Sequence, residues 1–361
     1  MAYYYEEPNN STFRYRSYNM AQVLNADSSK ETAPAHSASW FHRADLPALG
    51  ERLAEEADLL VVCRSGYEHR LARLIAAFRR RGKRVLFDVD DLVFDTRYVH
   101  LILNTMDQDA DQPEHWNYWF SYVGRMGATL DECDGAIATN AYLAERLAER
   151  CNKPVTVMPN FMNAEQLAAS DAAWQAKLSS GFARDGCLTL GYFSGSPSHS
   201  LDYAVAEPAI AALMARRPEL RLLTVGYIEP GAALAPFASR VSRAPFHDWV
   251  NLQRLLSRVE VNLMPLQPGR FTDCKSPLKY FEAAAVGTVS IASPSANYAP
   301  CIEQGVNGYL ARGHEWERMI DSTADSIGRY PDLAGNARKH ALQHFAWTTQ
   351  RPALLHALGW D

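Results

Sequence analysis

The sequence predicts an α/β protein with two doubly wound domains, each built on a parallel β-sheet, that face each other across a cleft. In both halves of the chain, short apolar runs of strand length alternate with longer stretches of helix length. This alternation is typical of parallel sheets covered by helices. A length of 361 residues is enough for two domains that each bury a core. Such domains bind ligands at the carboxyl ends of their strands, so we expect the functional site in the cleft.

In the first half, four apolar runs predict strands separated by helices. The runs are residues 59–63, 85–88, 135–139 and 155–158. Between the first two, apolar residues recur at helical spacing over 67–81, and the basic run 79–84 falls where that helix ends, because cations there complement the helix dipole. Residues 95–131 carry aromatic side chains but no strand signal, so we expect helices there with a loop around 107–113.

Four further runs predict the second sheet. They are residues 188–193, 220–225, 259–265 and 289–292, alternating with helix-like segments such as 204–216 and 278–285. A break near Pro159 divides the chain into two Rossmann-like domains, which we place at 1–160 and 161–340. We expect the last segment, 341–361, to be a helix that can cross back to the first domain.

Composition excludes several classes of function. The net charge of −5 and the lack of a long basic stripe argue against nucleic acid as a partner. The six scattered cysteines form no C-x-x-C pair, which argues against a disulfide framework or a zinc site and fits a reducing cytoplasm. No signal peptide opens the chain, and no apolar run approaches the roughly 18 residues needed to span a bilayer. We therefore expect a cytoplasmic protein, whose only membrane contact would be peripheral, at the inner face.

The segment 271–282 is the strongest candidate for a functional site. Ser276 is predicted to cap a helix, which would offer its first N–H groups to an anion such as a phosphate. Lys275 and Lys279 would add positive charge, and Glu282 could accept both hydroxyls of a ribose. In the alternative interpretation, Lys279 and Glu282 form an ordinary surface pair three residues apart on an amphipathic helix.

A second anion-binding candidate is the small-residue turn 191–199. Ser194 and Gly195 in this turn would let the backbone approach a diphosphate and donate N–H bonds. Many strand-to-helix turns have a similar composition, so this motif alone is weak evidence for an anion site.

Taken together, these motifs resemble glycosyltransferase family four. Residues 275–293 followed by 305–310 look like the donor-site block of that family, and 191–199, 220–226 and 157–160 match it in order and spacing. The resemblance covers the second domain specifically and the first more loosely. It implies the GT-B fold and transfer with retention of configuration. The variants at 88–91 and 194–195 resemble a subset that acts on bacterial surface polysaccharides.

The resemblance also implies roles for individual residues. Glu282 matches the second glutamate of the family's Glu-x7-Glu motif, which grips the ribose, whereas the first glutamate, which usually contacts the donor sugar, falls on Cys274. The loop at Phe246 aligns with the one that usually contacts the base.

The family's usual diphosphate pair of arginine and lysine is missing after Gly195. We therefore assign the phosphate charge to Lys275, Lys279 or Arg270. Arg14 or Arg16, in the first strand-to-helix turn of the GT-B fold, could also reach the phosphate or the acceptor. From the sequence alone, either arginine could equally well be an ordinary residue on the protein surface.

Three carboxylates, Asp88, Asp90 and Asp91, follow a predicted strand of the first half. They could be the nucleophile motif of a haloacid-dehalogenase-type phosphatase, or the metal-binding Asp-x-Asp of a GT-A transferase. A third interpretation places Asp88, Asp90 and Asp91 on the cleft face opposite the donor site, where they orient the acceptor hydroxyl or support the active site electrostatically. In the plainest interpretation, Asp88 caps the next segment and Asp90 is solvated. Three adjacent carboxylates repel one another, and such arrangements more often mark function.

The resemblance therefore implies a retaining hexosyl- or deoxyhexosyltransferase that uses a nucleotide-diphosphate sugar and no metal or other cofactor. The acceptor would be a glycan or lipid-linked glycan in the synthesis of a surface polysaccharide such as O-antigen lipopolysaccharide or capsule. No side chain is an evident nucleophile. We expect the leaving diphosphate to help deprotonate the acceptor on the same face, with Lys275 and Lys279 stabilising its charge. The alternative is a non-catalytic sugar-nucleotide or glycan-binding module of a larger polymerising protein.

Overall fold

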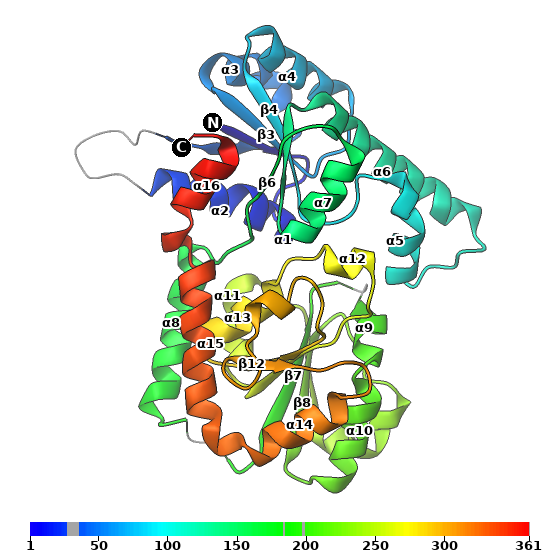
Figure 1. Cartoon of the computed structure of the whole chain (residues 1–361), viewed down its shortest axis with the longest axis vertical. Helices are drawn as coiled ribbons and strands as arrows, with labels where there is room; N and C mark the ends of the chain where they lie inside the picture. Colours follow the sequence, from blue (N-terminus) through cyan, green and yellow to red (C-terminus); the bar gives the residue numbers. More distant parts are fainter. Residues whose placement is uncertain (27–35, 183–184, 197–198, 361) are drawn as a thin grey trace.

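A computed structural model describes residues 1–26, 36–182, 185–196 and 199–360. It contains two six-stranded parallel sheets covered by helices, one above the other along the long axis of the molecule (Figure 1). We call the parts built around the first and the second sheet the N-domain and the C-domain. The predicted class of two doubly wound α/β domains is confirmed.

The N-domain sheet has the strand order β2-β1-β3-β4-β5-β6. Its strands are β1 (Ala2–Tyr5), β2 (Ser39–Phe41), β3 (Leu59–Cys63), β4 (Arg84–Val89), β5 (Gly135–Ala138) and β6 (Val155–Val157). The four strands predicted for this half are confirmed. β3 is buried along its whole length, as expected of a central parallel strand. β1 and β2 were not predicted, although the three tyrosines of β1 are all buried.

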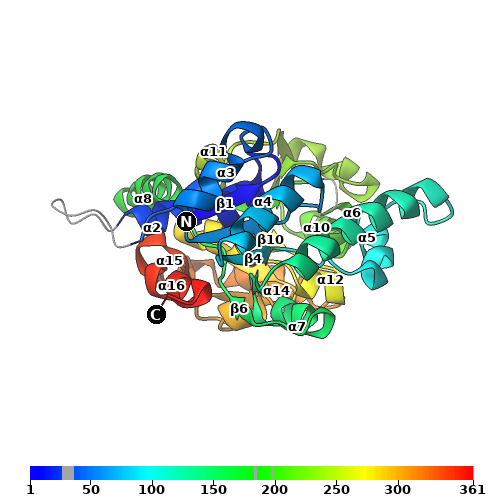
Figure 2. The same cartoon turned by 90° about the horizontal axis from the view of Figure 1, so that it is seen from above.

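Helices cover both faces of this sheet. They are α1 (Ser11–Phe13), the π-helix η1 (Arg14–Tyr18), α2 (Asn19–Asn25), α3 (Leu46–Glu56), α4 (His69–Arg80), η2 (Thr96–Tyr98), α5 (Val99–Thr105), α6 (Pro113–Glu132) and α7 (Ala141–Arg150). The apolar stripe of α4 is buried, and the carboxylate of Glu68 caps its first turn by accepting from the N–H of Leu71 at 3.0 Å. As predicted, 95–131 is helical with a loop before Pro113. Figure 2 shows α5 and α6 reaching out on the side opposite α16.

The C-domain sheet has the order β12-β11-β10-β7-β8-β9. Its strands are β7 (Leu188–Ser194), β8 (Leu220–Gly226), β9 (Val241–Ala244), β10 (Val261–Met264), β11 (Val289–Ala292) and β12 (Gly308–Leu310). The four predicted strands are confirmed here too. The two unpredicted ones, β9 and β12, lie at the edges of the sheet, where strands are short and need no continuous apolar run.

The helices that pack on this sheet are again on both of its faces. They are α8 (Ala164–Ser179), α9 (Ser200–Ala204), α10 (Glu207–Arg216), η4 (Ala232–Arg240), α11 (Trp249–Leu256), α13 (Leu278–Ala285), η5 (Ala299–Cys301), α14 (Trp316–Asp325), η6 (Ile327–Arg329) and α15 (Tyr330–Phe345). Three further elements contact helices of the N-domain: α12 (Arg270–Asp273) contacts α5, and η7 (Trp347–Thr349) and α16 (Arg351–Leu358) contact α2. Across the described ranges, no helix combines the length and the hydrophobicity needed to cross a bilayer.

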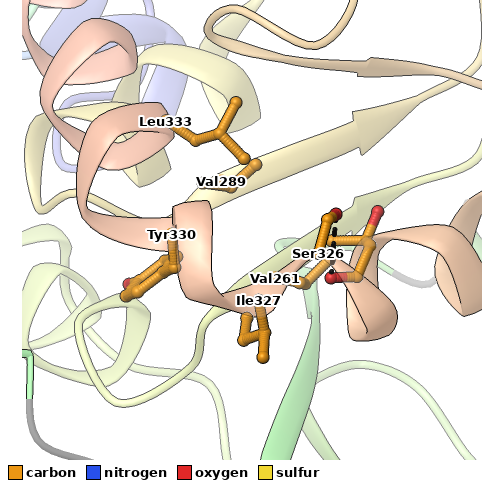
Figure 3. Close-up of a pocket in the computed structure, with 7 residues that line it drawn as sticks. Val261, Val289, Ser326, Ile327, Tyr330 and Leu333 are labelled. Carbon is orange, nitrogen blue, oxygen red and sulfur yellow. Dashed lines mark hydrogen bonds between the residues drawn. The ribbon is translucent and has the colours of Figure 1, made fainter.

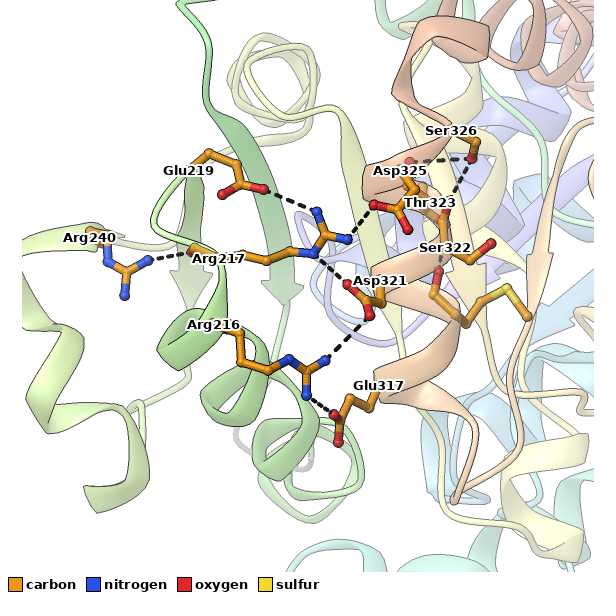
Figure 4. Close-up of polar contacts among 11 residues, drawn as sticks. Arg216, Arg217, Glu219, Arg240, Glu317, Asp321, Ser322, Thr323, Asp325 and Ser326 are labelled. Carbon is orange, nitrogen blue, oxygen red and sulfur yellow. Dashed lines mark hydrogen bonds and ion pairs between the residues drawn. The ribbon is translucent and has the colours of Figure 1, made fainter.

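A network of ion pairs joins α10 to α14 on the outside of the C-domain (Figure 4). Arg217 pairs with Asp321 and Asp325 on α14, and with Glu219 at 3.2 Å. Arg216 reaches Asp321 at 3.4 Å. Exposed pairs contribute little each, so the network fixes the position of α14 more than it stabilises the fold.

The chain crosses between the domains twice, and the two crossings lie side by side. The first passes through Met162, which forms a parallel bridge with Ala346 on the second. The N–H of Met162 donates to the carbonyl of Phe345 at 2.7 Å, and the N–H of Trp347 donates to the carbonyl of Met162 at 3.0 Å. Beyond the second crossing, α16 packs against α2 of the N-domain, and its Ala357 carbonyl accepts from the Thr156 hydroxyl at 3.1 Å (Figure 1).

Candidate active site

The candidate site is built from segments that follow the carboxyl ends of strands in both domains. From the N-domain come the turn after β1, which contains Arg14 and Tyr15, and the acidic segment after β4. From the C-domain come the turn after β7, the loops after β8 and β9, and the segment 265–278 after β10. Parallel strands place these ends on one edge of each sheet, which is why segments far apart in sequence can meet in one cleft.

Glu282 lies in the second turn of α13 and is buried at the meeting of the two domains. Its Oε1 accepts from the Tyr15 hydroxyl at 2.5 Å and from the Gln166 amide at 3.1 Å. Burial raises the pKa of Glu282, while the bond from Tyr15 and the charge of Arg14 oppose that rise. The simple surface pair with Lys279 is therefore excluded, because Glu282 is only 9% exposed.

Lys279 brings a buried positive charge to the same region. Its Nζ lies 4.8 Å from the ring centroid of Tyr192 and has no hydrogen-bond partner among the residues that the structure describes. Burial lowers the pKa of Lys279 to about 8, and the charge of Asp202 partly opposes this. A buried ammonium group without a partner is costly, so this group is suited to meet an anion.

Ser276 does not cap α13 as predicted. The helix begins at Leu278 with Pro277 at the N-cap, and no side chain bonds to its first turn. Proline cannot donate, and its carbonyl accepts from Tyr280 and Phe281. The hydroxyl of Ser276 is instead buried, with no partner in the described part of the chain. The helix start, with its positive dipole end, still lies beside Lys275 and Lys279.

The turn after β7 follows Ser194, which is two residues beyond Tyr192, and the ring centroid of Tyr192 lies 4.8 Å from Lys279 Nζ. The hydroxyl of Ser194 donates to the Ser196 carbonyl at 2.7 Å, and a Cβ placed on Gly195 would meet open space. Gly226, at the end of β8, has φ of +88°, and a Cβ there would strike the carbonyl oxygen of Ser194. Glycine at 226 therefore allows the ends of β7 and β8 to approach closely.

His199 and Asp202, which sequence reasoning did not assign to the site, lie beside the lysines. His199 Nδ1 is 3.0 Å from Asp202 Oδ2. Burial, followed by the charges of Lys279 and Lys275, lowers the pKa of His199 to about 3, so the ring is neutral at physiological pH. Asp202 also accepts from the N–H of Gln267 at 2.9 Å. The signal in the sequence was the position of His199 at the end of the small-residue turn.

The acidic segment after β4 divides into two parts. Asp88 is buried and accepts two bonds of 2.7 Å from Arg16, whose guanidinium also donates to the carbonyl of Met158 and to Asn160. The capping role proposed for Asp88 is therefore wrong, and so is its placement on the cleft face, because Asp88 is 1% exposed and both of its carboxylate oxygens are bonded to Arg16. Arg16 is fully buried with all three nitrogens bonded inside the protein, so the structure does not bring it to the cleft as a phosphate ligand.

Asp90 and Asp91 are held together by Arg64. One guanidinium nitrogen of Arg64 donates to both carboxylates at 2.8 Å, and Thr12 donates to the other oxygen of Asp90 at 2.8 Å. Burial raises the pKa of Asp91, whereas Arg64 and, from the other domain, Lys275 oppose the rise. Asp91 is thus close enough to Lys275 of the C-domain for that charge to act on its carboxylate. Arg64 has φ of +32°, an unfavourable conformation that no pattern in the sequence predicts.

Cys274 is not exposed to a ligand. It is fully buried and, with Phe271, belongs to the hydrophobic core of the N-domain, so this part of the C-domain packs against its neighbour. Asn140, after β5, strengthens this contact by donating to the carbonyls of Lys275 at 2.9 Å and Asp273 at 3.3 Å. Burial raises the pKa of the Cys274 thiol, so it remains neutral.

Two exposed aromatic rings follow the strands β8 and β9 of the C-domain. Phe246, after β9, is 56% exposed, and Tyr227, after β8, is 50% exposed, with ring centroids 5.6 Å apart. Arg14 lies nearer to Glu282, with its guanidinium 5.4 Å from the Tyr15 ring and 5.3 Å from the Trp249 ring. Tyr227 and Trp249 were not predicted, because a single aromatic residue in a loop or at the start of a helix gives no pattern.

A depression elsewhere in the C-domain is not a candidate for the same chemistry. Figure 3 shows it lined by Val261, Val289, Ile327, Tyr330 and Leu333, among others. Val261 and Val289 are the first residues of β10 and β11, so the depression lies at the amino ends of these strands. Its lining is mainly apolar, without convergent charges.

Comparison with known proteins agrees with this architecture. Residues 187–327 match the family model described as glycosyl transferases group 1. The chain is similar to the crystal structure of HepE from Anabaena in complex with UDP, with 14% identity, 99% of each chain covered and a TM-score of 0.64. It is also similar to sucrose-phosphate synthase from Thermosynechococcus elongatus, with 15% identity, 99% of this chain and 96% of that one covered, and a TM-score of 0.60.

A glycosyltransferase from Rickettsia africae is similar as well, with 11% identity, 100% of this chain and 98% of that one covered, and a TM-score of 0.63. No curated protein sequence matches significantly. At these identities the solved structures establish the fold alone, which is GT-B, so the GT-A fold considered for Asp88 to Asp91 is excluded. The fold and the family match of the C-domain together support a glycosyltransferase.

Proposed function

We propose that this protein is a retaining glycosyltransferase that moves a hexosyl or deoxyhexosyl group from a nucleotide-diphosphate sugar to a hydroxyl of a glycan acceptor. One observation carries the proposal: a buried carboxylate, Glu282, lies one turn from a buried ammonium, Lys279, at the start of α13, and this ammonium has no hydrogen-bond partner among the described residues. The carboxylate suits the two hydroxyls of a ribose. The ammonium suits a phosphate.

The donor would lie along the C-domain, from the aromatic loops to the turn after β7. Tyr227 and Phe246 offer exposed rings against which a base can stack. Lys275, Lys279 and the start of α13 would hold the diphosphate, and Ser194 and Gly195 leave room for it. HepE, a structural neighbour, has been crystallised with UDP and with UDP-glucose, which supports a nucleotide in this position.

The acceptor would enter from the N-domain side. Asp91, opposite Lys275, would orient the incoming hydroxyl, with Asp90 and Arg64 holding it in place. We infer that the leaving diphosphate takes the proton of the acceptor on the face from which it departs. Lys275 and Lys279 stabilise the negative charge that develops on it. This route uses side chains and donor alone and needs no metal.

We further propose, from the sequence variants at 88–91 and 194–195, that the acceptor is a glycan or lipid-linked glycan of a bacterial surface polysaccharide. Work on such an acceptor would place the protein in the cytoplasm, in peripheral contact with the inner face of the membrane. Cys274, packed in the N-domain core where a sugar-binding glutamate was expected, favours one rival: a module that binds a sugar nucleotide without turnover.

A panel of nucleotide sugars distinguishes the two. Calorimetry against UDP, GDP, TDP and CMP identifies the base, and donor hydrolysis is then followed with the matching sugars. If the protein is the proposed enzyme, we expect slow hydrolysis of the donor that persists in EDTA and that Glu282→Ala abolishes. Tight binding without hydrolysis or transfer, with every sugar of the panel, would favour the module. Loss of hydrolysis in EDTA would refute the metal-independent mechanism.

A further inference from the structure

Three buried side chains from three different elements meet at one oxygen atom. Tyr15 comes from η1 of the N-domain, Gln166 from α8 and Glu282 from α13 of the C-domain. The Tyr15 hydroxyl donates to Glu282 Oε1 at 2.5 Å, and the Gln166 amide donates to the same oxygen at 3.1 Å and to the Tyr15 hydroxyl at 3.1 Å. Tyr15 is 2% exposed and Gln166 is fully buried. The triad therefore connects the two domains through the carboxylate.

The geometry leaves one side of this carboxylate for a ligand. Both donors bond to Oε1, whereas a carboxylate has about four lone-pair sites on its two oxygens. Within the described residues, Oε2 of Glu282 thus retains its accepting capacity. A bond of 2.5 Å from a buried tyrosine restricts rotation of the carboxylate, so Oε2 has one preferred direction.

We propose that Tyr15 is a positioning residue that fixes Glu282 for the ribose of the donor, so that nucleotide recognition in the C-domain depends on contact with the N-domain. This inference rests on the function proposed above, in which Glu282 binds the ribose. It adds that the sequence-distant Tyr15 acts through Glu282 and touches no part of the nucleotide itself. Opening of the cleft would remove the Tyr15 hydroxyl from Oε1 and weaken the grip on ribose.

Tyr15→Phe is the appropriate variant, because it removes the hydroxyl alone. The ring keeps its contact with Phe281, 6.2 Å away between centroids, and with Arg14. Tyr18→Phe provides a matched control. Tyr18 lies on the same π-helix, and its hydroxyl donates to Glu165 of α8 at 2.7 Å, so this variant also removes a tyrosine–glutamate bond between η1 and a C-domain helix, but at the surface and away from Glu282.

The experiment compares the affinity of the full chain for UDP and for 2′-deoxy-UDP by calorimetry, or for GDP and 2′-deoxy-GDP if the protein prefers guanine. We expect Tyr15→Phe to weaken the ribonucleotide about tenfold and the deoxynucleotide less than twofold, because the lost bond orients the group that reads the hydroxyls. Tyr18→Phe should change neither. Equal weakening of both ligands by Tyr15→Phe would show a general structural effect and overturn the inference, as would no change in either.

Glu282→Ala separates failure of the inference from failure of the proposed function. If Glu282→Ala abolishes the preference for the ribonucleotide while Tyr15→Phe keeps it, Glu282 binds ribose but Tyr15 does not position it, and only the inference is wrong. If Glu282→Ala keeps the preference, or if the wild-type protein binds neither UDP nor GDP, the proposed ribose site is wrong and the inference is wrong with it.

Discussion

The affinity of the C-domain for a nucleoside diphosphate should fall as the pH rises through about 8, because the buried Lys279 loses its proton there. Burial lowers the pKa of Lys279 to about 8. Only the protonated form attracts the diphosphate, so the contribution of Lys279 to binding is complete below this pKa and is lost above it. A phosphate group ionises near pH 6 and keeps its charge over this range.

The size of the loss in affinity follows from the titration of Lys279. One unit above the pKa, about a tenth of the lysine remains protonated, so affinity falls by up to about tenfold, or about 1.4 kcal/mol, for each further pH unit. Binding of the diphosphate stabilises the ammonium form, so complex formation above pH 8 should take up protons.

Calorimetry with UDP or GDP from pH 7 to 9.5, in buffers of different ionisation enthalpy, measures both effects. Lys279→Arg keeps its charge throughout this range and should show a flat profile without proton uptake, whereas Lys279→Met should be weak and flat. Lys275→Arg is the matched control and should keep the decline, since Lys279 is intact. A flat profile for the wild-type protein, or a decline that persists in Lys279→Arg, would refute the assignment of Lys279 to the phosphate.

Three further predictions concern other parts of the cleft. Asp88→Ala leaves the guanidinium of Arg16 buried without its ion-pair partner and should lower the free energy of unfolding, measured by urea denaturation, by about 3–5 kcal/mol. A loss below about 1 kcal/mol would contradict the buried ion pair. Arg64→Ala leaves Asp90 and Asp91 close together without their shared cation, so kcat for transfer should fall while the Kd for nucleotide stays within about twofold. An equal loss in kcat and in nucleotide affinity would contradict a role on the acceptor side. Phe246→Ala should weaken nucleotide binding by about 1–3 kcal/mol with an unchanged melting temperature, since the ring is exposed and supports no core; unchanged affinity would exclude stacking on this ring.

The central strands could be predicted from the sequence because a parallel strand buried on both faces reads as a continuous apolar run. β3 and β11 even have the predicted bounds. The missed strands lack this signal. β1 is four residues of Ala-Tyr-Tyr-Tyr, and β9 and β12 are three or four residues at the sheet edges, held mainly by their pairing with β8 and β11.

Within the site, local motifs were predictable and long-range pairings were not. Lys275, Lys279 and Glu282 lie in one segment, and their spacing along a predicted helix indicated a site. The partners of Arg16 and Glu282 lie 72 and 267 residues away, and no local pattern relates them. The cap at Ser276 failed for a different reason: Pro277 is not helical and takes the N-cap position itself, so the helix starts later than the preferred Ser-Pro pattern suggests.

The paired crossings at Met162 and Ala346 limit how the two domains can move. A single flexible connection would let them tumble and separate freely, but two backbone segments bonded side by side form a short ribbon that resists twisting. The motion of one domain relative to the other is then mainly a rotation about that ribbon. Labels on the facing edges of the cleft should therefore change their separation along a single coordinate, and each closure should return Asp91 and Lys275 to the same alignment.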